Sequence, residues 1–259
     1  MTSASRRERR QAGFVERRDA RRARHAPKSA SPLRSPMALF TIGALVLGLV
    51  IVVVVFLQQP ATSAVSLELT SPGARIPPGL SDGRTLGQAA APVTVEIWSD
   101  FQCPACRTLA TDVEPAIIEA YVVSGTAKLV YRDAAFQGQR GTNRAYDESV
   151  EAGAAARCAA VQGRFWEMHD WIFANWSGEN RGAFRAERLR AIADMARLDL
   201  AAYDSCLAAG TEQAAVRTET GQALALGINS TPTLLINGQR SVGAPSVEQL
   251  SAMIEGALP

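Results

Sequence analysis

Residues 93–106 read VTVEIWSDFQCPAC, and the prediction of the fold starts from this stretch. Residues 93–98 are rich in β-branched and apolar side chains, which is typical of a buried strand. Cys103 and Pro104 follow a short turn, and proline suits the first turn of a helix. The stretch therefore predicts a strand that leads into a helix, with Cys103 and Cys106 in the first turn of that helix.

The sequence after this stretch extends the pattern to an α/β fold. Apolar residues continue at helical spacing to Tyr121, and residues 128–132, KLVYR, are expected to form a second strand, which predicts a strand–helix–strand unit. Helices then interrupt the α/β domain between its second and third strands, so we expect a helical insertion at about residues 137–228. The helices are expected at residues 148–161, 165–176, 186–196, 200–209 and 212–226, the strands at 233–237 and 240–242, and a last helix near 246–258.

The N-terminal part of the chain differs sharply in composition from the rest. Residues 1–36 hold eleven basic and three acidic side chains, a net charge of +8, whereas the whole chain has a net charge of +2. Residues 37–57, MALFTIGALVLGLVIVVVVFL, carry no charge. A helix of this length crosses a bilayer, so we expect a single transmembrane signal anchor. A cleaved signal peptide is the alternative, with residues 62–64 as its cleavage site.

The position of the basic residues predicts the orientation of this anchor. Cytoplasmic flanks of membrane helices carry an excess of lysine and arginine, and the first basic residue after the span is Arg75. Residues 1–36 are therefore expected to form a disordered cytoplasmic tail, with residues 58–259, including a globular domain at 91–259, outside the cytoplasm. Because aromatic residues do not alternate with the arginines of the tail, we do not expect nucleic-acid binding. Residues 58–90, rich in proline and glycine, are interpreted as a linker.

The two cysteines of the CPAC motif point to redox chemistry. A cysteine at a helix N-terminus faces free backbone N–H groups and the positive end of the helix dipole, which favour the thiolate. Cys103 is therefore the candidate nucleophile, and Cys106, one turn further in, is placed to resolve a mixed disulfide. A zinc site would need two more ligands, and the chain has only two histidines and no second CxxC motif. A purely structural disulfide remains the other reading. No metal or cofactor is expected.

Three motifs, in order, resemble DsbA-like thioredoxin-fold proteins over about residues 85–259. Leu86-Gly87 followed by residues 91–106 is similar to their opening strand and active site, and CAAVQGRFWEMHD at 158–170 is similar to a helix of their inserted domain. GINSTPT at 227–233 resembles their cis-proline loop. The resemblance implies a thioredoxin-like fold and a bacterial thiol–disulfide oxidoreductase, a family in which a membrane anchor is common.

The same resemblance implies roles for particular residues. Cys103 is the nucleophilic and Cys106 the resolving cysteine, while Pro232 is the cis-proline beside them. Thr231 precedes this proline and presents backbone groups to a substrate peptide. Pro104 and Ala105 complete the active-site loop. Strongly oxidising members often carry histidine in place of Ala105, so here the helix terminus stabilises the thiolate without that help.

An acidic residue and a second pair of cysteines are further candidates for a role. Glu96 lies in a strand expected to be covered on both faces, near the place where the thioredoxin fold buries an acid, and is a candidate proton relay for Cys106. Cys158 and Cys206 lie in two helices of the insertion. We expect them to form a structural disulfide, the alternative being two buried free thiols.

The expected function is that of a membrane-anchored, extracytoplasmic dithiol oxidase. It would pass its Cys103–Cys106 disulfide to secreted proteins with free thiols, and a quinone-linked membrane reoxidase of the DsbB or VKOR type would restore it. The reverse activity, a thiol reductase for example in cytochrome maturation, uses the same residues and is distinguished by the redox potential. A non-catalytic thioredoxin-like binding module is the alternative from another class.

Overall fold

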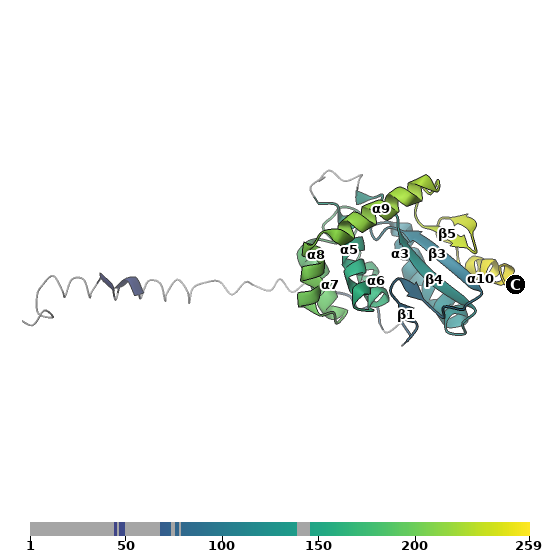
Figure 1. Cartoon of the computed structure of the whole chain (residues 1–259), viewed down its shortest axis with the longest axis horizontal. Helices are drawn as coiled ribbons and strands as arrows, with labels where there is room; N and C mark the ends of the chain where they lie inside the picture. The colour runs from purple at the N-terminus through teal and green to yellow at the C-terminus, as the bar shows by residue number, and fades with distance from the viewer. Residues whose placement is uncertain (1–43, 46, 50–67, 74–75, 78, 139–145) are drawn as a thin grey trace, which may run out of the picture. The chain divides into compact units, whose positions relative to one another are not determined.

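The computed structural model describes residues 44–45, 47–49, 68–73, 76–77, 79–138 and 146–259 (Figure 1). The chain divides into two units, Met1–Val65 and Ser66–Pro259. In the first unit the described residues, 44–45 and 47–49, are helical and exposed. Within the described parts of the chain, no helix has the length and apolar character needed to cross a membrane. The predicted tail and most of the predicted span at 37–57 lie outside the described residues.

The second unit is built on a six-stranded mixed sheet with the strand order β1-β2-β4-β3-β5-β6. The central strands β3 and β4 are parallel, whereas β5 pairs antiparallel with β3. Figure 1 shows these strands side by side, with α10 close to the C-terminus. The strands are β1 (Ser81–Asp82), β2 (Thr85–Leu86), β3 (Val93–Ser99), β4 (Ala127–Asp133), β5 (Thr233–Ile236) and β6 (Gln239–Val242).

The helix that joins β3 to β4 is interrupted by π-helical turns. It runs as α3 (Pro104–Thr108), a π-helical turn (Leu109–Val113), α4 (Glu114–Ile117) and a second π-helical turn (Ile118–Val122). The predicted strand–helix–strand unit is confirmed by this connection and by the parallel pairing of β3 with β4. The π-helical turns are not encoded in the apolar spacing that predicted one continuous helix.

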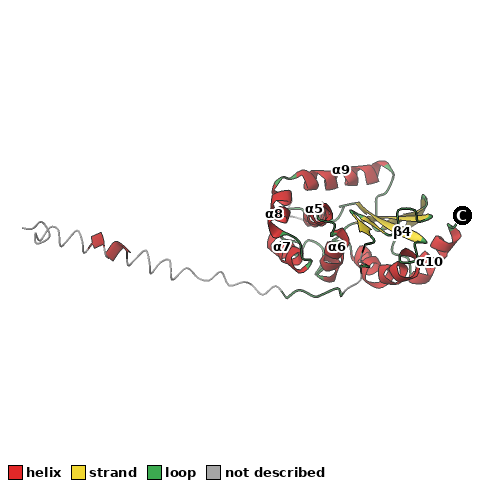
Figure 2. Cartoon of the chain, turned by 60° about the horizontal axis from the view of Figure 1, so that its bottom comes forward, coloured by secondary structure: helices red, strands yellow, loops and turns green. Residues whose placement is uncertain are grey.

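The helical insertion lies between β4 and β5, as predicted. Figure 2 shows its helices grouped beside the sheet, with α9 leading from this group back over the strands. Asp147 and Asp199 cap α5 and α8, because each carboxylate accepts two backbone N–H groups of the first turn. The insertion and the last helix comprise α5 (Glu148–Val161), α6 (Phe165–Ala174), α7 (Ala186–Met195), α8 (Leu200–Ala208), α9 (Thr211–Ala225) and α10 (Val247–Gly256).

The predicted linker at residues 58–90 is too long at its C-terminal end. The hairpin of β1 and β2 belongs to the sheet, because Thr85 and Leu86 pair with Val130 and Leu129 of β4. Two-residue strands leave no recognisable alternation in a sequence, and they exist only through pairing with a longer strand. Thr70 is also held to the globular unit, since its N–H donates to Asn175 Oδ1 at 2.8 Å.

A cluster of charged side chains joins the insertion to the sheet. The guanidinium of Arg157 on α5 contacts Asp133 of β4 at 2.6 Å and Glu219 of α9 at 2.7 Å. Arg84, from the loop between β1 and β2, contacts both carboxylates. Burial alone would raise the pKa of Glu219, but Arg84 and Arg157 hold it at about 2. Paired in this way, the buried charges fix the insertion to β4.

Candidate active site

The fold places Cys103 directly before the first residue of α3, as its N-cap. The Cys103 side chain is 3% exposed. The two residues that follow it are more accessible, since Pro104 is exposed and Ala105 is half-buried. The Cys103 thiol donates to the backbone oxygen of Thr231 at 3.3 Å. Both Cys103 and Cys106 are free thiols in this structure.

The environment of Cys103 stabilises its thiolate. The pKa of Cys103 is lowered to about 6, in the first place because the Cys106 thiol donates a hydrogen bond to its sulfur. Burial opposes this shift, whereas the Thr231 hydroxyl and the backbone N–H groups of Ala105 and Cys106 add to it. These two N–H groups belong to the first turn of α3, where backbone donors have no partner within the helix. A large fraction of Cys103 is therefore ionised at neutral pH.

Cys106 has the opposite character. Its side chain is 1% exposed, and burial together with the neighbouring Cys103 raises the pKa of the Cys106 thiol well above its usual range. The thiol therefore keeps its proton while Cys103 is ionised. The pair holds one thiolate and one thiol, which is the arrangement needed for a nucleophile and a resolving cysteine.

The loop before β5 brings Thr231 and Pro232 to this pair from the far end of the chain. The Thr231–Pro232 peptide bond is cis, and the Pro232 carbonyl accepts the N–H of Gly243 at 2.8 Å. The residues assigned to the active-site loop, Pro104, Ala105, Thr231 and Pro232, thus come together around Cys103.

Glu96 does not lie near the cysteines, and its predicted role as a proton relay is wrong. Its side chain is 31% exposed and contacts Arg132 at 3.5 Å. Successive side chains of a strand point to opposite faces. Val95 and Ile97 belong to the main core with Cys106, whereas Trp98, on the same face of β3 as Glu96, packs with Ala223 of α9.

The buried carboxylate at this site is instead Asp100, which the sequence analysis did not single out. Its side chain is 2% exposed, and burial raises its pKa to about 7. It accepts hydrogen bonds from the backbone of Gln102 and Gln137 and from the Ser149 hydroxyl. The sequence offered one signal for Asp100, because it lies directly after a buried strand and three residues before Cys103. Its partners Gln137 and Ser149, however, are distant in the sequence.

Cys158 and Cys206 are joined in a disulfide in the structure. The bridge connects α5 to α8, with a Cα–Cα distance of 5.8 Å. Cys158 is buried and Cys206 is half-buried at the edge of the core. This bridge holds two helices of the insertion together. The free cysteines are then Cys103 and Cys106 of the CPAC motif.

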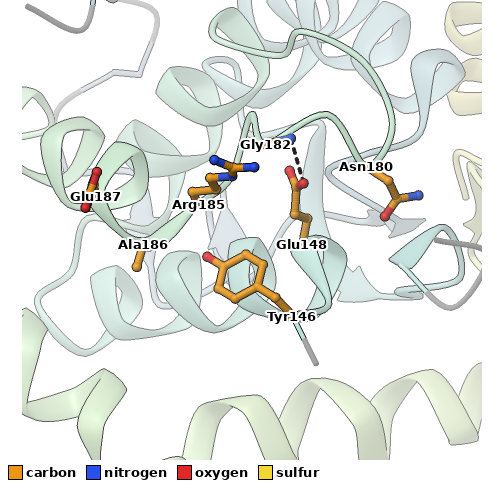
Figure 3. A pocket seen from close by; sticks show the side chains of 7 residues that line it. All are labelled: Tyr146, Glu148, Asn180, Gly182, Arg185, Ala186 and Glu187. Atoms are coloured by element: carbon orange, nitrogen blue, oxygen red, sulfur yellow. Dashed lines mark hydrogen bonds between the residues drawn. The ribbon is translucent and has the colours of Figure 1, made fainter. Parts of the chain in front are cut away.

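A separate pocket of about 460 Å³ lies within the insertion (Figure 3). Glu148 points into the pocket region and accepts the N–H groups of Gly182 and Phe184, while the Tyr146 hydroxyl donates to the Phe184 carbonyl. These polar groups already have partners, and neither cysteine of the CPAC motif lines the pocket. Among the described residues, no group of three or more histidine, cysteine or acidic side chains is arranged to hold a metal.

Replacing Thr231 with valine is expected to raise the pKa of Cys103. Valine keeps the branched shape but removes the hydroxyl that stabilises the thiolate. At a pH near the wild-type pKa of Cys103, the fraction of thiolate should therefore fall by about two- to fivefold. Titration of the ultraviolet absorbance of the thiolate measures this change. Thr231→Ser, which keeps the hydroxyl, is the matched control and should titrate like the wild type. An unchanged titration in Thr231→Val would mean that the hydroxyl does not act on the sulfur.

Comparison with known proteins places this site in a family. The model of the thioredoxin family, described as Thioredoxin, matches residues 80–256. The Na(+)/H(+) antiporter NhaA 3 of Salinispora tropica is 31% identical over 171 residues, which is 66% of this chain but only 24% of the antiporter. The chain thus spans about a quarter of the length of that relative. The probable disulfide bond formation protein D of Bacillus anthracis is 27% identical and matches 69% of this chain and 79% of its own length.

Solved structures show the same architecture. Oxidised BdbD from Bacillus subtilis has a TM-score of 0.60 at 21% identity, covering 68% of this chain and 92% of BdbD. The α-DsbA1 protein of Wolbachia pipientis has a TM-score of 0.58 at 18% identity, covering 73% of this chain and 96% of that protein. At these identities the likeness concerns the fold alone. The family model, however, matches well over half of the chain. The chain therefore belongs to the thioredoxin family.

Proposed function

We propose that the chain is a thiol–disulfide oxidoreductase that works as a dithiol oxidase, introducing disulfides into secreted proteins. The observation that carries this proposal is the place of Cys103 at the N-terminus of α3, beside Cys106 and Thr231, where hydrogen bonds to its sulfur lower its pKa to about 6. A stabilised thiolate favours the reduced form of the pair, so the Cys103–Cys106 disulfide gives up its oxidising equivalents readily. The similarity to the probable disulfide bond formation protein D of Bacillus anthracis supports the same direction.

Disulfide transfer would proceed in two exchange steps. A substrate thiolate attacks the Cys103 sulfur, the Cys103–Cys106 bond breaks, and Cys106 leaves and takes up a proton. A second substrate thiolate then attacks the substrate sulfur of this mixed disulfide and releases Cys103 as a thiolate. The substrate loses two electrons and gains a disulfide, while the enzyme pair is reduced. A low pKa makes Cys103 a good leaving group in the second step.

The loop around Pro232 gives the substrate its place in this reaction. The backbone oxygen of Thr231 faces Cys103 in the reduced enzyme, at 3.3 Å. An extended substrate segment would bond to the backbone of this loop and thereby align its sulfur with Cys103. Substrate selection would then depend on backbone contacts and on the exposed surface near Pro104, which suits an enzyme with many unfolded substrates.

The proposal includes a location outside the cytoplasm and a membrane partner. The basic residues before residues 37–57 favour an anchor with the catalytic unit on the extracytoplasmic side. The Cys158–Cys206 disulfide fits a compartment in which thiols oxidise. Since each transfer leaves the enzyme reduced, a quinone-linked reoxidase in the same membrane would restore the Cys103–Cys106 disulfide.

Equilibration of the full chain with reduced and oxidised glutathione tests the direction of the reaction. The pair is expected to be more oxidising than glutathione. The protein should therefore stay largely reduced when reduced and oxidised glutathione are present at equal concentrations. The oxidised protein should also convert a reduced, unfolded model protein with two cysteines to its disulfide form. A pair that is more reducing than glutathione would overturn the oxidase and indicate a reductase. A pair that exchanges with neither reagent would indicate a binding module.

A further inference from the structure

The loop between β3 and α3 buries a carboxylate beside the two reactive sulfurs. The Asp100 side chain is 2% exposed, and its backbone oxygen accepts the N–H of Cys103 at 3.0 Å. The backbone N–H of Asp100 in turn acts as a hydrogen-bond donor to the Cys106 sulfur. Asp100 is therefore fixed to both cysteines through its main chain, and its carboxylate cannot move away without disturbing the start of α3.

The carboxylate is held by neutral groups. Gln102 and Gln137 donate their backbone N–H groups to it at 2.8 Å each, and the Ser149 hydroxyl on α5 donates at 3.1 Å. These bonds lower the pKa of Asp100, but the larger effect of burial raises it to about 7. A carboxylate paired with a cation would stay ionised over the whole physiological range. Asp100, with these neutral partners, changes its charge near neutral pH.

The titratable groups that face Asp100 come from two elements. Cys103 and Cys106 belong to the start of α3, and Tyr131 belongs to β4. Burial raises the pKa of both Tyr131 and Cys106 well above their usual ranges, so these two groups stay neutral near pH 7. The Cys103 thiolate is then the negative charge that interacts with Asp100, and each charge disfavours the other.

We propose that Asp100 is a positioning residue of the redox site whose negative charge opposes the Cys103 thiolate and so makes the oxidising strength of the Cys103–Cys106 pair depend on pH. The proposal rests on the proposed function only in taking Cys103 as the reactive thiolate. It deepens that function by assigning a device that sets how strongly the pair oxidises.

The charge balance of the redox step gives the direction of the effect. In the reduced protein Cys103 carries a negative charge and Cys106 a proton. When a disulfide reagent oxidises the pair, the Cys103–Cys106 bond forms, two electrons pass to the reagent, the Cys106 proton leaves and the charge on Cys103 disappears. Repulsion by ionised Asp100 therefore exists only in the reduced protein. Above the pKa of Asp100 it destabilises the reduced form and weakens the pair as an oxidant, and below that pKa it is absent.

The experiment compares Asp100→Asn with the wild type in the full chain, equilibrated with glutathione over a range of pH. The amide has nearly the same shape but no charge. The two proteins should agree at about pH 5.5, and at about pH 8.5 the variant should be about three- to tenfold more oxidising in its equilibrium constant. In the variant the Cys103 thiolate should also form at lower pH than in the wild type. Its titration curve should be narrower, because it is no longer coupled to the titration of Asp100. An equal change at every pH, or no change at any pH, would overturn the proposal.

Two further variants separate this effect from damage to the fold. Ser149→Ala removes one hydrogen bond that favours ionised Asp100. The fall in the oxidising strength of the pair with rising pH should therefore remain but occur at higher pH. This outcome is expected even if Asp100→Asn folds poorly, and a fall at the same pH as in the wild type would contradict the proposal. Glu96→Gln makes the same chemical change on the partly exposed carboxylate of β3 and should have no effect. Because the thiolate titration needs no substrate, it tests Asp100 even if the protein fails to oxidise other proteins.

Discussion

Cys103→Ser is expected to abolish disulfide transfer, with residual activity below about a thousandth of the wild-type rate. A serine hydroxyl does not ionise at neutral pH and forms no disulfide, so neither exchange step can occur. The fold should be retained, because a serine hydroxyl can replace the Cys103 thiol as the hydrogen-bond donor to the Thr231 carbonyl. Transfer is measured by the loss of thiols from a reduced, unfolded model protein. Substantial remaining activity would mean that the nucleophile is another group.

Cys106→Ser is expected to fail in a different way, by trapping mixed disulfides. The Cys106 thiol donates the hydrogen bond that contributes most to the low pKa of Cys103. A serine hydroxyl can still donate this bond, so Cys103 remains reactive, but it cannot resolve the product. After exposure to oxidised glutathione, intact mass should show one glutathione on nearly every molecule. Cys106→Ala, which lacks the donor, should form the same adduct more slowly. Absence of an adduct in both variants would contradict the assigned roles.

Removal of the Cys158–Cys206 disulfide is expected to lower the free energy of unfolding by about 4 kcal/mol, mainly by freeing the unfolded chain. The bridge closes a loop between residues 48 positions apart and ties α5 to α8. Cys158→Ala together with Cys206→Ala tests this in denaturant titrations. The double variant Cys103→Ser and Cys106→Ser, which keeps the bridge, is the matched control and should lose much less. A loss below about 1 kcal/mol would show that the bridge contributes little to stability.

Stepwise reduction followed by alkylation and mass spectrometry gives a second measure of the same bridge. We expect the Cys103–Cys106 disulfide to be reduced first, since its reduced form is stabilised, and the Cys158–Cys206 bridge to resist. Alkylation of Cys158 and Cys206 in the denatured protein without any reduction would contradict the bridge in solution.

Local patterns in the sequence were sufficient to predict most of the fold. The strand over residues 93–98 and the helices of the insertion follow from apolar spacing and turn signals, and each was observed within one or two residues of its expected bounds. The position of the cysteine pair at the start of a helix was predicted for the same reason, because a CxxC motif and a helix start are local features. The cis-proline loop was found only through the resemblance of residues 227–233 to a known family.

The parts that were missed depend on contacts between distant residues. The hairpin of β1 and β2 is stable only because β4 pairs with it. The role given to Glu96 failed because alternation along β3 does not tell which face the cysteine helix covers. Asp100 stayed hidden because burial and its bonds to Gln137 and Ser149 form only in the folded chain.

The order of the strands has a consequence for the synthesis of the protein. β5, next to β3 in the sheet, is made more than a hundred residues later, as the pairing of Ile97 with Leu234 shows. A growing chain therefore presents Cys103 and Cys106 long before Thr231 can reach them. Contacts over such separations form late and slowly. Any chain that ends between Cys106 and Thr231 lacks the loop that faces Cys103, so such an incomplete product carries both sulfurs but not the complete redox centre.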